Sequence, residues 1–503
     1  MPVGADLSTA NLASLSSHEA VGDAASLLVY LQSQYKITKT ISFGCSYAGS
    51  LTTFARGTLP HLIHAAVASS APVKAQAAHE GYNTVVGTSL GRTDTGGSPA
   101  CLAAVRSAFS TLTATFTSGT SAAKGAMAAQ LSSCDANTDS WSSLDVMWFA
   151  TNAATILQEG VQYAGRNGSA YSISRMCRLM TSSPGDPLAG LAALMNDTLA
   201  DESARKVVGG WIPISNKTGG GYCYNNSWSS WIAGLSNVTV DTVSPKSDRQ
   251  WLFQCCTQFG FCSWGSCQNA TTCPFSPLMN LEETGAFCGD APSGAFSAAT
   301  SRAAMASRFD WTNAELGGYA GPAAGRVMFV NGDVDPWSSI SATHLNPAAE
   351  DGGVSYSPSN PESEQDLNPA NPSIWVANGS HCSDYGSPNP ATDSASLTAA
   401  RAKIQAQVAE WLSDAYPQYG YPASCAAAGG GGDESSNHPV QRAVIVTAAI
   451  ALCLGGGVAV LAAVRRRRGA EAARRAREGL FVEGHEGLDE PFVDNWQPAV
   501  QTH

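Results

Sequence analysis

Charged side chains are scarce in this sequence: Asp, Glu, Lys and Arg make up 14% of its 503 residues, against about 25% in an average soluble domain. Cations are the scarcer sign, with 28 Lys and Arg against 40 Asp and Glu and a net charge of −12. Because phosphate backbones are bound by clustered cations, this balance argues against nucleic acid as a partner. The apolar share of 44% still allows a large core, which excludes a globally disordered chain.

Several ligand-binding motifs are also absent. The sequence has no G-x-x-x-x-G-K-[ST] phosphate loop and no H-E-x-x-H zinc-peptidase motif. Six of the 14 cysteines fall between residues 255 and 288, yet no two follow the C-x2-C spacing and residues 262–273 contain no histidine. This pattern favours disulfides over a metal site, so we expect no metal and an oxidising compartment. Seven N-x-[ST] sequons are compatible with a glycoprotein in that compartment.

One long apolar run lies near the C-terminal end. Residues 443–464 carry no charge and would span about 33 Å as a helix at ~1.5 Å per residue. Arg465–Arg468 follow directly, which is typical of a transmembrane helix whose basic end faces the cytosol; a buried core helix is the alternative. We therefore expect a single-pass membrane protein, with the preceding domain lumenal (endolysosomal) or extracellular (cell surface), a Gly-rich linker over 417–442 and a cytosolic tail over 465–503.

An export signal is missing at the other end. The first twenty residues have neither the basic start nor the apolar centre of a signal peptide. Since a lumenal domain of this size needs such a signal, we expect that the natural beginning of the domain precedes this sequence.

Strand and helix patterns alternate in two separate parts of the chain. Apolar runs at 40–43 and 63–68, with an Ala/Leu-rich stretch between them, predict strand, helix and strand. Strand patterns return at 326–330 and 373–377, before an amphipathic helix over 393–415.

The stretch between these parts differs in composition. Residues 76–309 are rich in Ala, Ser and Gly and hold most of the cysteines, which predicts a mainly helical, disulfide-containing insertion. The whole pattern predicts an α/β fold, namely an α/β-hydrolase core in two parts, 1–75 and 310–416, with residues 76–309 as a cap.

Gly44-Cys45-Ser46-Tyr47-Ala48 lies directly after a predicted strand and opens a predicted helix. A nucleophile on so sharp a turn needs small residues two positions to either side, and Gly44 and Ala48 meet that need. The helix directs its N-terminal dipole and N–H groups at this point. Ser46 is therefore a candidate nucleophile, and the backbone N–H of Tyr47 is a candidate oxyanion donor.

Candidate partners for this serine follow two later strands. Asp335 lies in Asn-Gly-Asp-Val-Asp-Pro-Trp and His381 in Asn-Gly-Ser-His-Cys, each after a predicted strand. The order serine, aspartate, histidine is that of α/β hydrolases. We predict that His381 takes the proton of Ser46 and that Asp335 orients the imidazole. Asp333 is the competing candidate for the acid.

Six segments carry a resemblance to a known family: FGCSYAGSL, PHLIHAAVASSAPV, DRQWLFQCCTQFGF, CPFSPL, VMFVNGDVDPW and GSHCSD. From about residue 3 to 416 the chain resembles the serine peptidases that include lysosomal Pro-X carboxypeptidase and dipeptidyl peptidase II, and most of all their thymus-specific serine protease branch. The resemblance implies hydrolysis of peptides without a cofactor, often beside proline and near a chain end, under a helical cap.

The same resemblance implies roles for individual residues. Ser46, Asp335 and His381 match the triad of the family, and Trp337 resembles a wall of the pocket for the residue before the scissile bond. A flat aromatic surface at that place suits a proline ring.

Three departures from the family pattern stand out. Cys45 replaces the usual glycine before the serine, and Gln258 replaces a glutamate. The Gly-rich loop expected to complete the oxyanion hole would precede residue 1. Since losing one oxyanion donor costs about 10²–10³ in rate, we expect the chain as given to be poorly active or unstable.

Two alternative functions fit the same features. One is a catalytically impaired, membrane-tethered binding protein on a hydrolase scaffold, and the other is an esterase or lipase with the same triad. The main prediction is a serine exopeptidase acting on peptide substrates. The sequence does not choose between carboxypeptidase, dipeptidyl peptidase and endopeptidase action, and it leaves homodimerisation open.

Overall fold

The structure of the chain is a computed structural model. The described residues are 6–76, 79–165, 172–208, 214–216, 220–239, 248–260, 266–269, 271–280, 286–288, 302–318, 321–343, 370–414 and 459–463. The predicted linker 417–442 and the predicted tail 465–503 lie outside them.

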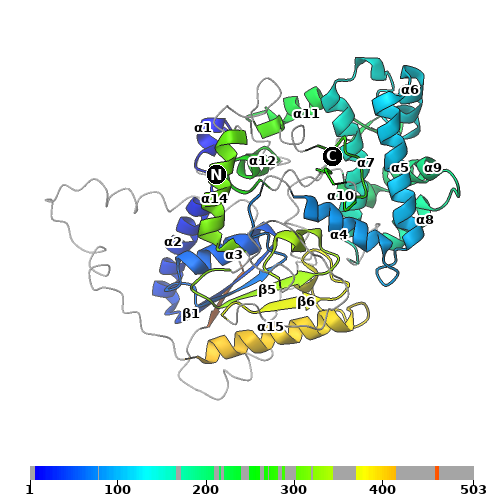
Figure 1. The fold of residues 1–503 in the computed structure, drawn as a ribbon. Helices are drawn as coiled ribbons and strands as arrows, with labels where there is room; N and C mark the ends of the chain where they lie inside the picture. The colour runs from blue at the N-terminus through cyan, green and yellow to red at the C-terminus, as the bar shows by residue number, and fades with distance from the viewer. Residues whose placement is uncertain are drawn as a thin grey trace.

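A parallel sheet organises one half of the described chain (Figure 1). Its strands run in the order β6-β5-β2-β1, and each neighbouring pair is parallel. Every residue of β2 and of β5 is buried, as in strands that are covered on both faces. The strands span β1 Lys39–Cys45, β2 Ala65–Ser69, β5 Val327–Gly332 and β6 Ser373–Val376.

A fifth strand, β7 (Ala459–Ala463), pairs antiparallel with β1. We predicted a helix for these five residues, as part of 443–464. The strand forms because the edge of β1 offers a row of backbone groups, and a short apolar run fits a strand as well as a helix. The rest of 443–464 lies outside the described residues, and none of the helices that the structure describes is long and apolar enough to cross a membrane. The transmembrane span stays a prediction.

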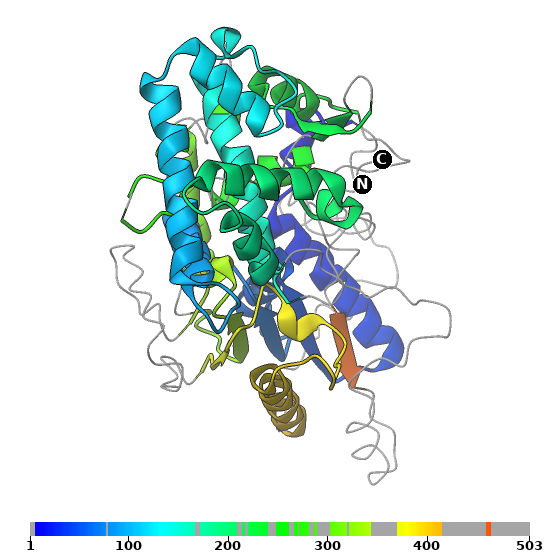
Figure 2. The same ribbon diagram turned by 90° about the vertical axis from the view of Figure 1, so that its right-hand side faces the viewer.

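Helices cover both faces of the sheet (Figures 1 and 2). On one face, Ile404 and Val408 of α15 share a buried cluster with Val67 and Val330. On the other face α3 packs against β1 and β2, and α2 and α14 pack against α3. These helices span α2 Ser17–Tyr35, α3 Tyr47–Thr58, α14 Arg302–Leu316 and α15 Ala395–Ser413. We call the sheet with these four helices the sheet region.

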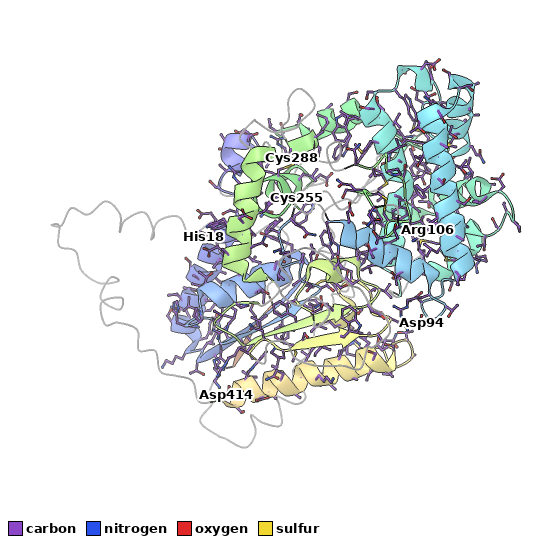
Figure 3. The ribbon with its side chains drawn as sticks, viewed as in Figure 1. His18, Asp94, Arg106, Cys255, Cys288 and Asp414 are labelled. Carbon is purple, nitrogen blue, oxygen red and sulfur yellow. A yellow bond between two sulfur atoms is a disulfide. The ribbon has the colours of Figure 1, made fainter. Side chains whose placement is uncertain are left out.

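Two cations fasten the C-terminal end of α15 to the sheet. The guanidinium of Arg326 pairs with the carboxylate of Asp414 at 3.0 Å. The ammonium of Lys39 donates to the carbonyl oxygens of Trp411 at 3.1 Å and Leu412 at 2.6 Å. Asp414 is labelled at this end of the helix in Figure 3. Cations at a helix C-terminus complement the negative end of its dipole, which favours this docking.

A layer of helices, which we call the helical region, lies on one side of the sheet region (Figures 1 and 2). Its core includes Phe109, Leu112, Phe149 and Leu157, none of which is exposed to solvent. Helix α7 is central, since its residues from Met147 to Gln162 are all buried. The helices span α4 Glu80–Gly91, α5 Pro99–Ser118, α6 Ser121–Gln130, α7 Ser143–Gln162, α8 Ile173–Met180, α9 Pro187–Ala200 and α10 Glu202–Val208.

The remaining described elements are short. They are α1 Thr9–Leu12, the hairpin β3 Ile214–Asn216 and β4 Tyr222–Tyr224, α11 Trp228–Leu235, α12 Asp248–Gln254, a π-helix η2 at Cys255–Phe259, and the 3₁₀ turns η1 Thr138–Ser140, η4 Ala286–Cys288, η7 Pro336–Ile340 and η8 Ser383–Tyr385.

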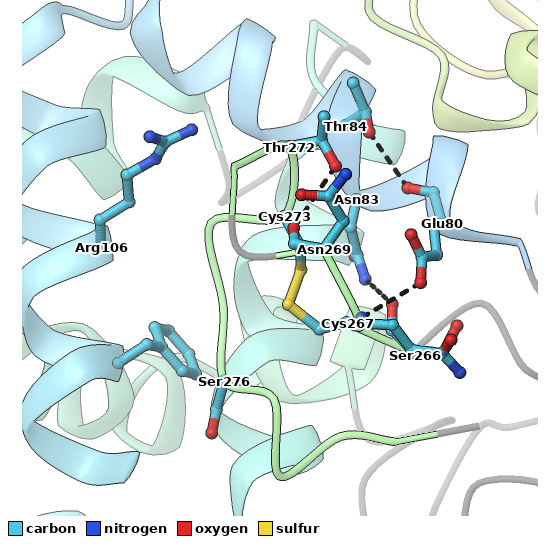
Figure 4. Close-up of a disulfide and its surroundings, with 12 residues drawn as sticks. Glu80, Asn83, Thr84, Arg106, Ser266, Cys267, Asn269, Thr272, Cys273 and Ser276 are labelled. Carbon is cyan, nitrogen blue, oxygen red and sulfur yellow. Dashed lines mark hydrogen bonds between the residues drawn. A yellow bond between two sulfur atoms is a disulfide. The ribbon is translucent and has the colours of Figure 1, made fainter. Parts of the chain in front are cut away.

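Disulfides join cysteines in both regions, which confirms their predicted use. Cys267–Cys273 closes a small loop beside α4, where the side-chain nitrogen of Asn83 donates to the carbonyl oxygen of Ser266 at 2.9 Å (Figure 4). Most pairs lie outside the sheet, and one links the last residue of β1 to the loop after β6. The described pairs are Cys45–Cys382, Cys101–Cys177, Cys134–Cys223, Cys256–Cys288 and Cys267–Cys273. The described chain is thus a mixed α/β protein with a parallel sheet and disulfides.

Candidate active site

Ser46 occupies a sharp turn between the end of β1 and the start of α3. Its φ of 59° and ψ of −132° lie outside the regions that a serine ordinarily adopts. A Cβ at Gly44 would lie 2.0 Å from the carbonyl oxygen of Ala48, so only glycine fits there. The N–H of Ser46 donates to the carbonyl oxygen of Ser69 at 2.9 Å, which ties the turn to the end of β2.

Tyr47 is the first residue of α3, a position whose N–H points out of the helix rather than into it. Its phenol lies 3.0 Å from the hydroxyl of Ser17 and accepts from the side-chain nitrogen of Gln254 at 2.9 Å. Burial raises the pKa of this phenol. Gln258 accepts from the N–H of Ser17 at 3.1 Å, so it belongs to the same polar cluster beside the serine turn. These contacts fix the beginning of the helix.

Asp335 and His381 meet at the carboxyl ends of β5 and β6. Both oxygens of the Asp335 carboxylate lie 3.0 Å from Nδ1 of His381. The aspartate is fully buried and the histidine is 3% exposed. The N–H of Trp337 donates to the same carboxylate at 3.0 Å. An imidazole held in this way presents its other nitrogen, Nε2, for chemistry.

Asp333, the competing acid, faces elsewhere. Its carboxylate pairs with the guanidinium of Arg92 at 2.9 Å and accepts from the N–H of Asn378 at 2.6 Å. Burial raises the pKa of this carboxyl group, against the opposing effect of Arg92. The structure therefore brings Asp335, rather than Asp333, to the histidine.

The loops that carry the aspartate and the histidine are in direct backbone contact. The N–H of Val334 donates to the carbonyl oxygen of Gly379 at 3.0 Å. A Cβ at Gly332 would lie 2.0 Å from that same oxygen, so the approach depends on glycine at this position. Backbone contacts alone therefore hold the two loops to each other.

A disulfide brings the serine turn to the histidine loop. Cys45 directly precedes Ser46 and Cys382 directly follows His381, and the Cα atoms of the two cysteines are 5.9 Å apart. The three predicted triad residues thus lie on adjoining loops, and two of them are hydrogen bonded.

Aromatic side chains gather beside the histidine. The ring of Trp337 lies 5.3 Å from that of His79, 5.5 Å from that of Tyr82 and 6.3 Å from that of His381, between centroids. We call Trp337, His79 and Tyr82 the aromatic wall. Burial lowers the pKa of His79 to about 3. The wall therefore carries no positive charge at neutral pH.

Gln162, the last residue of α7, connects the helical region to both the wall and the histidine. Its side-chain oxygen accepts from Nε1 of Trp337 at 2.8 Å and from the phenol of Tyr82 at 2.7 Å. Its carbonyl oxygen accepts from the N–H of His381 at 2.9 Å. Sequence reasoning missed this residue, because a single glutamine in a mostly apolar helix has no motif around it.

Asp384 is a second residue that sequence reasoning did not single out. The hydroxyl of Ser69 donates to its carboxylate, and the guanidinium of Arg401 donates to its backbone carbonyl at 3.2 Å. Burial raises the pKa of this carboxyl group to about 6, against the opposing effect of the Ser69 hydrogen bond. Asp384 is the last residue of the segment GSHCSD, which carries part of the family resemblance. That segment could have indicated the residue, but the resemblance assigned it no role.

A metal site is not found in the described part of the chain: none of its His, Cys, Asp and Glu side chains form a group of three or more that could hold an ion.

Several known proteins are similar in sequence to this chain. A family profile described as serine carboxypeptidase S28 matches residues 1–351. The thymus-specific serine protease of Mus musculus is 34% identical over 426 residues, which cover 82% of this chain and 72% of the mouse protein. The protein of the same name from Homo sapiens is 34% identical over 421 residues, which cover 82% of this chain and 71% of the human protein.

Proposed function

The chain belongs to the serine carboxypeptidase S28 family, a family of serine peptidases, and we propose that it hydrolyses peptides with Ser46 as nucleophile, His381 as general base and Asp335 as the acid of the triad. The observation that carries the proposal is the hydrogen bond from His381 to Asp335 at 3.0 Å, on a loop that the Cys45–Cys382 disulfide joins to the serine turn. The likeness to the thymus-specific serine proteases supports the same activity.

In the first half of the reaction, Nε2 of His381 accepts the proton of Ser46 as its oxygen attacks the peptide carbonyl. The buried carboxylate of Asp335 keeps the proton on Nδ1 and stabilises the imidazolium that forms. The imidazolium then returns the proton to the leaving amine, which leaves an acyl-enzyme on Ser46. In the second half, water takes the place of the amine and the same groups act again.

The negative charge on the carbonyl oxygen needs donors during both steps. Tyr47 supplies a backbone N–H at the start of α3, where the helix dipole favours an anion. The polar cluster that holds the Tyr47 side chain fixes the position of this donor without using the N–H itself.

The aromatic wall supports a preference for proline in the residue before the scissile bond. Trp337 lies next to His381 and offers a flat apolar surface, and the neighbouring His79 is neutral. A proline ring loses little conformational freedom against such a surface and is well suited to it. Gln162 places the end of α7 against both the wall and the histidine loop. The helical region therefore borders the site, and such a neighbour supports action near a chain end rather than in the middle of a long substrate.

The finer architecture and location are part of the proposal. We assign the sheet region to an α/β-hydrolase core and the helical region to its cap, since Ser46, Asp335 and His381 follow strands in the order of that fold. We also propose that residues 443–464 span a membrane, which requires residues 459–463 to form a helix there instead of the strand β7, with the disulfide-containing part in an oxidising lumen or outside the cell. Retention of the full chain in the membrane pellet after alkaline carbonate extraction is the expected result, and complete release would contradict it.

A fluorophosphonate probe tests the catalytic assignment. We expect the full chain to be labelled, Ser46→Ala to lose labelling, and Ser33→Ala, an exposed serine of α2, to keep it. Labelling of Ser46→Ala at the rate of the unmodified chain would contradict the assignment, and no labelling of any form would favour a catalytically impaired binding protein.

A peptide panel tests the specificity. Peptides with proline at successive positions, each with free or blocked termini, are incubated with the full chain and the products are identified by mass. Release of single C-terminal residues next to proline is the result expected for a carboxypeptidase, and release of N-terminal dipeptides is that expected for a dipeptidyl peptidase. Cleavage that ignores both termini would contradict exopeptidase action.

A further inference from the structure

The Cys45–Cys382 disulfide differs in position from the other described disulfides. It joins residues 337 apart in the sequence and connects the last residue of β1 to the loop after β6. Each of its cysteines is the immediate neighbour of a proposed triad residue. Consecutive Cα atoms are about 3.8 Å apart, and the two cysteine Cα atoms are 5.9 Å apart. The bond therefore limits the separation of the Ser46 and His381 Cα atoms to less than about 14 Å, whatever else the loops do.

Backbone geometry at this place is demanding. Ser46, Ser70 and Cys382 all have positive φ, at 59°, 48° and 57°. Non-glycine residues hold such conformations only where surrounding contacts impose them. Three positive-φ residues on three loops at the carboxyl edge of the sheet therefore require restraints between those loops.

The restraints run through the end of β2. The N–H of Cys382 donates to the hydroxyl of Ser70 at 2.8 Å, and the N–H of Ser46 donates to the carbonyl oxygen of Ser69 at 2.9 Å. The Ser69 hydroxyl in turn donates to Asp384. These hydrogen bonds hold each loop to β2, whereas the disulfide alone joins the serine turn to the histidine loop covalently.

We propose that the Cys45–Cys382 disulfide is a positioning element of the active site, which holds the His381 imidazole within reach of the Ser46 hydroxyl. This inference rests on the proposed function. Both cysteines act through their neighbours and touch no reacting atom. Loss of the bond leaves the histidine loop held by Asp335, Ser70 and Gln162, but removes its covalent link to the serine turn.

The test is a double variant of the full chain, Cys45→Ala/Cys382→Ala, with Cys101→Ala/Cys177→Ala as a matched control that removes a disulfide of the helical region. For each we measure the rate of phosphonylation by the fluorophosphonate probe, kcat and KM on a proline-containing peptide, and Tm. A displacement of about 1 Å between reacting groups costs on the order of 10² in rate. We expect phosphonylation and kcat of the first variant to fall about 100-fold with KM changed less than about threefold.

The control separates positioning from stability. Cys101→Ala/Cys177→Ala lowers Tm, because it removes a cross-link from the folded chain, but it leaves kcat within about threefold of the unmodified chain, since it lies away from the reacting groups. A first variant that folds and keeps kcat and phosphonylation within threefold of the unmodified chain would overturn the proposal.

A third variant, Cys45→Ala/Cys382→Gly, separates the effect of losing the disulfide from the effect of backbone strain at position 382. Glycine adopts the φ of 57° at position 382 without steric cost, so this variant also carries the test if the alanine variant does not fold. We expect it to remain about 100-fold slow. Recovery to within threefold would assign the loss to strain and overturn the proposal. If the unmodified chain itself is not labelled, the proposed function fails; if it is labelled and these variants are equally fast, only the positioning role fails.

Discussion

The sheet region and the helical region are held together by different means. In the sheet region, hydrogen bonds between parallel strands bring together segments from both ends of the described chain, and one disulfide joins residues 337 apart. In the helical region, apolar helix packing is supplemented by disulfides such as Cys101–Cys177, which joins residues 76 apart. All three proposed triad residues come from the sheet region. Under the proposed function, the sheet region positions the reacting groups and the helical region borders them.

Side chains at the junction of the two regions make this comparison testable. Gln162 and Tyr82 of the helical region contact Trp337, and Gln162 also contacts the histidine loop. Changes in the sheet region should therefore act on kcat, changes at the junction on substrate binding, and changes inside the helical region on stability alone.

The largest effect is expected for Asp335→Asn in the sheet region. The amide no longer stabilises the imidazolium or holds the required tautomer, so kcat should fall about 10⁴-fold. Asp333→Asn is the matched control two residues away, because its carboxylate pairs with Arg92 instead of the histidine. Steady-state kinetics on one peptide measure both. A greater loss of kcat in Asp333→Asn than in Asp335→Asn would reverse the assignment of the acid.

The next effect concerns pH and stability at the same edge of the sheet. The folded pKa of Asp384 is raised to about 6 from 3.8, so the folded chain holds this proton more tightly than the unfolded chain. Its contribution to the free energy of unfolding is then fully present below about pH 4 and is lost as the pH rises through about 6. At 1.36 kcal/mol per unit the shift amounts to ~3 kcal/mol, and since part of the residue is exposed we expect about 1–2 kcal/mol.

Asp384→Asn measures this contribution, because the amide stays neutral at every pH. As the pH rises from 4 to 7, the free energy of unfolding of the variant should increase by about 1–2 kcal/mol relative to that of the unmodified chain. Urea unfolding at a series of pH values gives the difference. Parallel curves for the two proteins across that range would contradict the raised pKa.

A smaller effect is expected for Gln162→Leu at the junction. The substitution removes the acceptor of the Trp337 and Tyr82 hydrogen bonds, and buried donors left without a partner cost about 1–3 kcal/mol. We expect Trp337 and Tyr82 to shift in response, which misplaces the aromatic wall. The ratio kcat/KM should therefore fall about 10-fold, mainly through a higher KM.

Gln158→Leu, one turn earlier in α7, is the matched control for Gln162→Leu. Its side chain donates to Asn83 within the helical region, at 2.7 Å, whereas the side chain of Gln162 accepts from Trp337 and Tyr82 of the wall. It should lower Tm and leave KM unchanged. Equal changes of KM in the two variants would show that the helical region acts as a whole rather than through its junction.

The smallest effect is expected inside the helical region. Arg175 pairs with Asp197 at 2.8 Å and with Asp201 at 3.1 Å, and all three side chains are 28% exposed. Partly exposed ion pairs contribute little, so Arg175→Gln should cost less than about 1 kcal/mol of unfolding free energy and leave kcat and KM unchanged. Thermal unfolding and steady-state kinetics of the same preparation test both. A change in kcat would mean that the two regions are coupled beyond their junction.

Local patterns predicted much of the sheet region. The strand expected at 40–43 is β1, that at 326–330 is β5 and that at 373–377 is β6, each with bounds that differ by a few residues. Helix α15 was expected over 393–415 and ends at Ser413. These elements could be predicted because the periodicity of their apolar residues reflects which of their faces are buried.

Other features could not be predicted from local patterns. Cys45 was noted as a departure from the family, but its partner was not predicted, because 14 cysteines allow very many pairings and sequence does not rank them. The strand β7 replaced an expected helix because apolar runs fit either conformation until an edge is available. The pKa of Asp384 depends on burial, which no neighbouring residue in the sequence reveals.

The sequence by itself determined where the side chains of the proposed triad stand along the chain: a serine between Gly44 and Ala48, and an aspartate and a histidine after later strands. This was possible because a nucleophile turn and a strand end are local features with strict steric requirements. Only the tertiary structure decided that Asp335 rather than Asp333 contacts His381 and that Cys45 joins Cys382. It also decided that Gln162 links the helical region to Trp337 beside the site. Those contacts depend on distances between segments remote in the sequence, which only the packed fold defines.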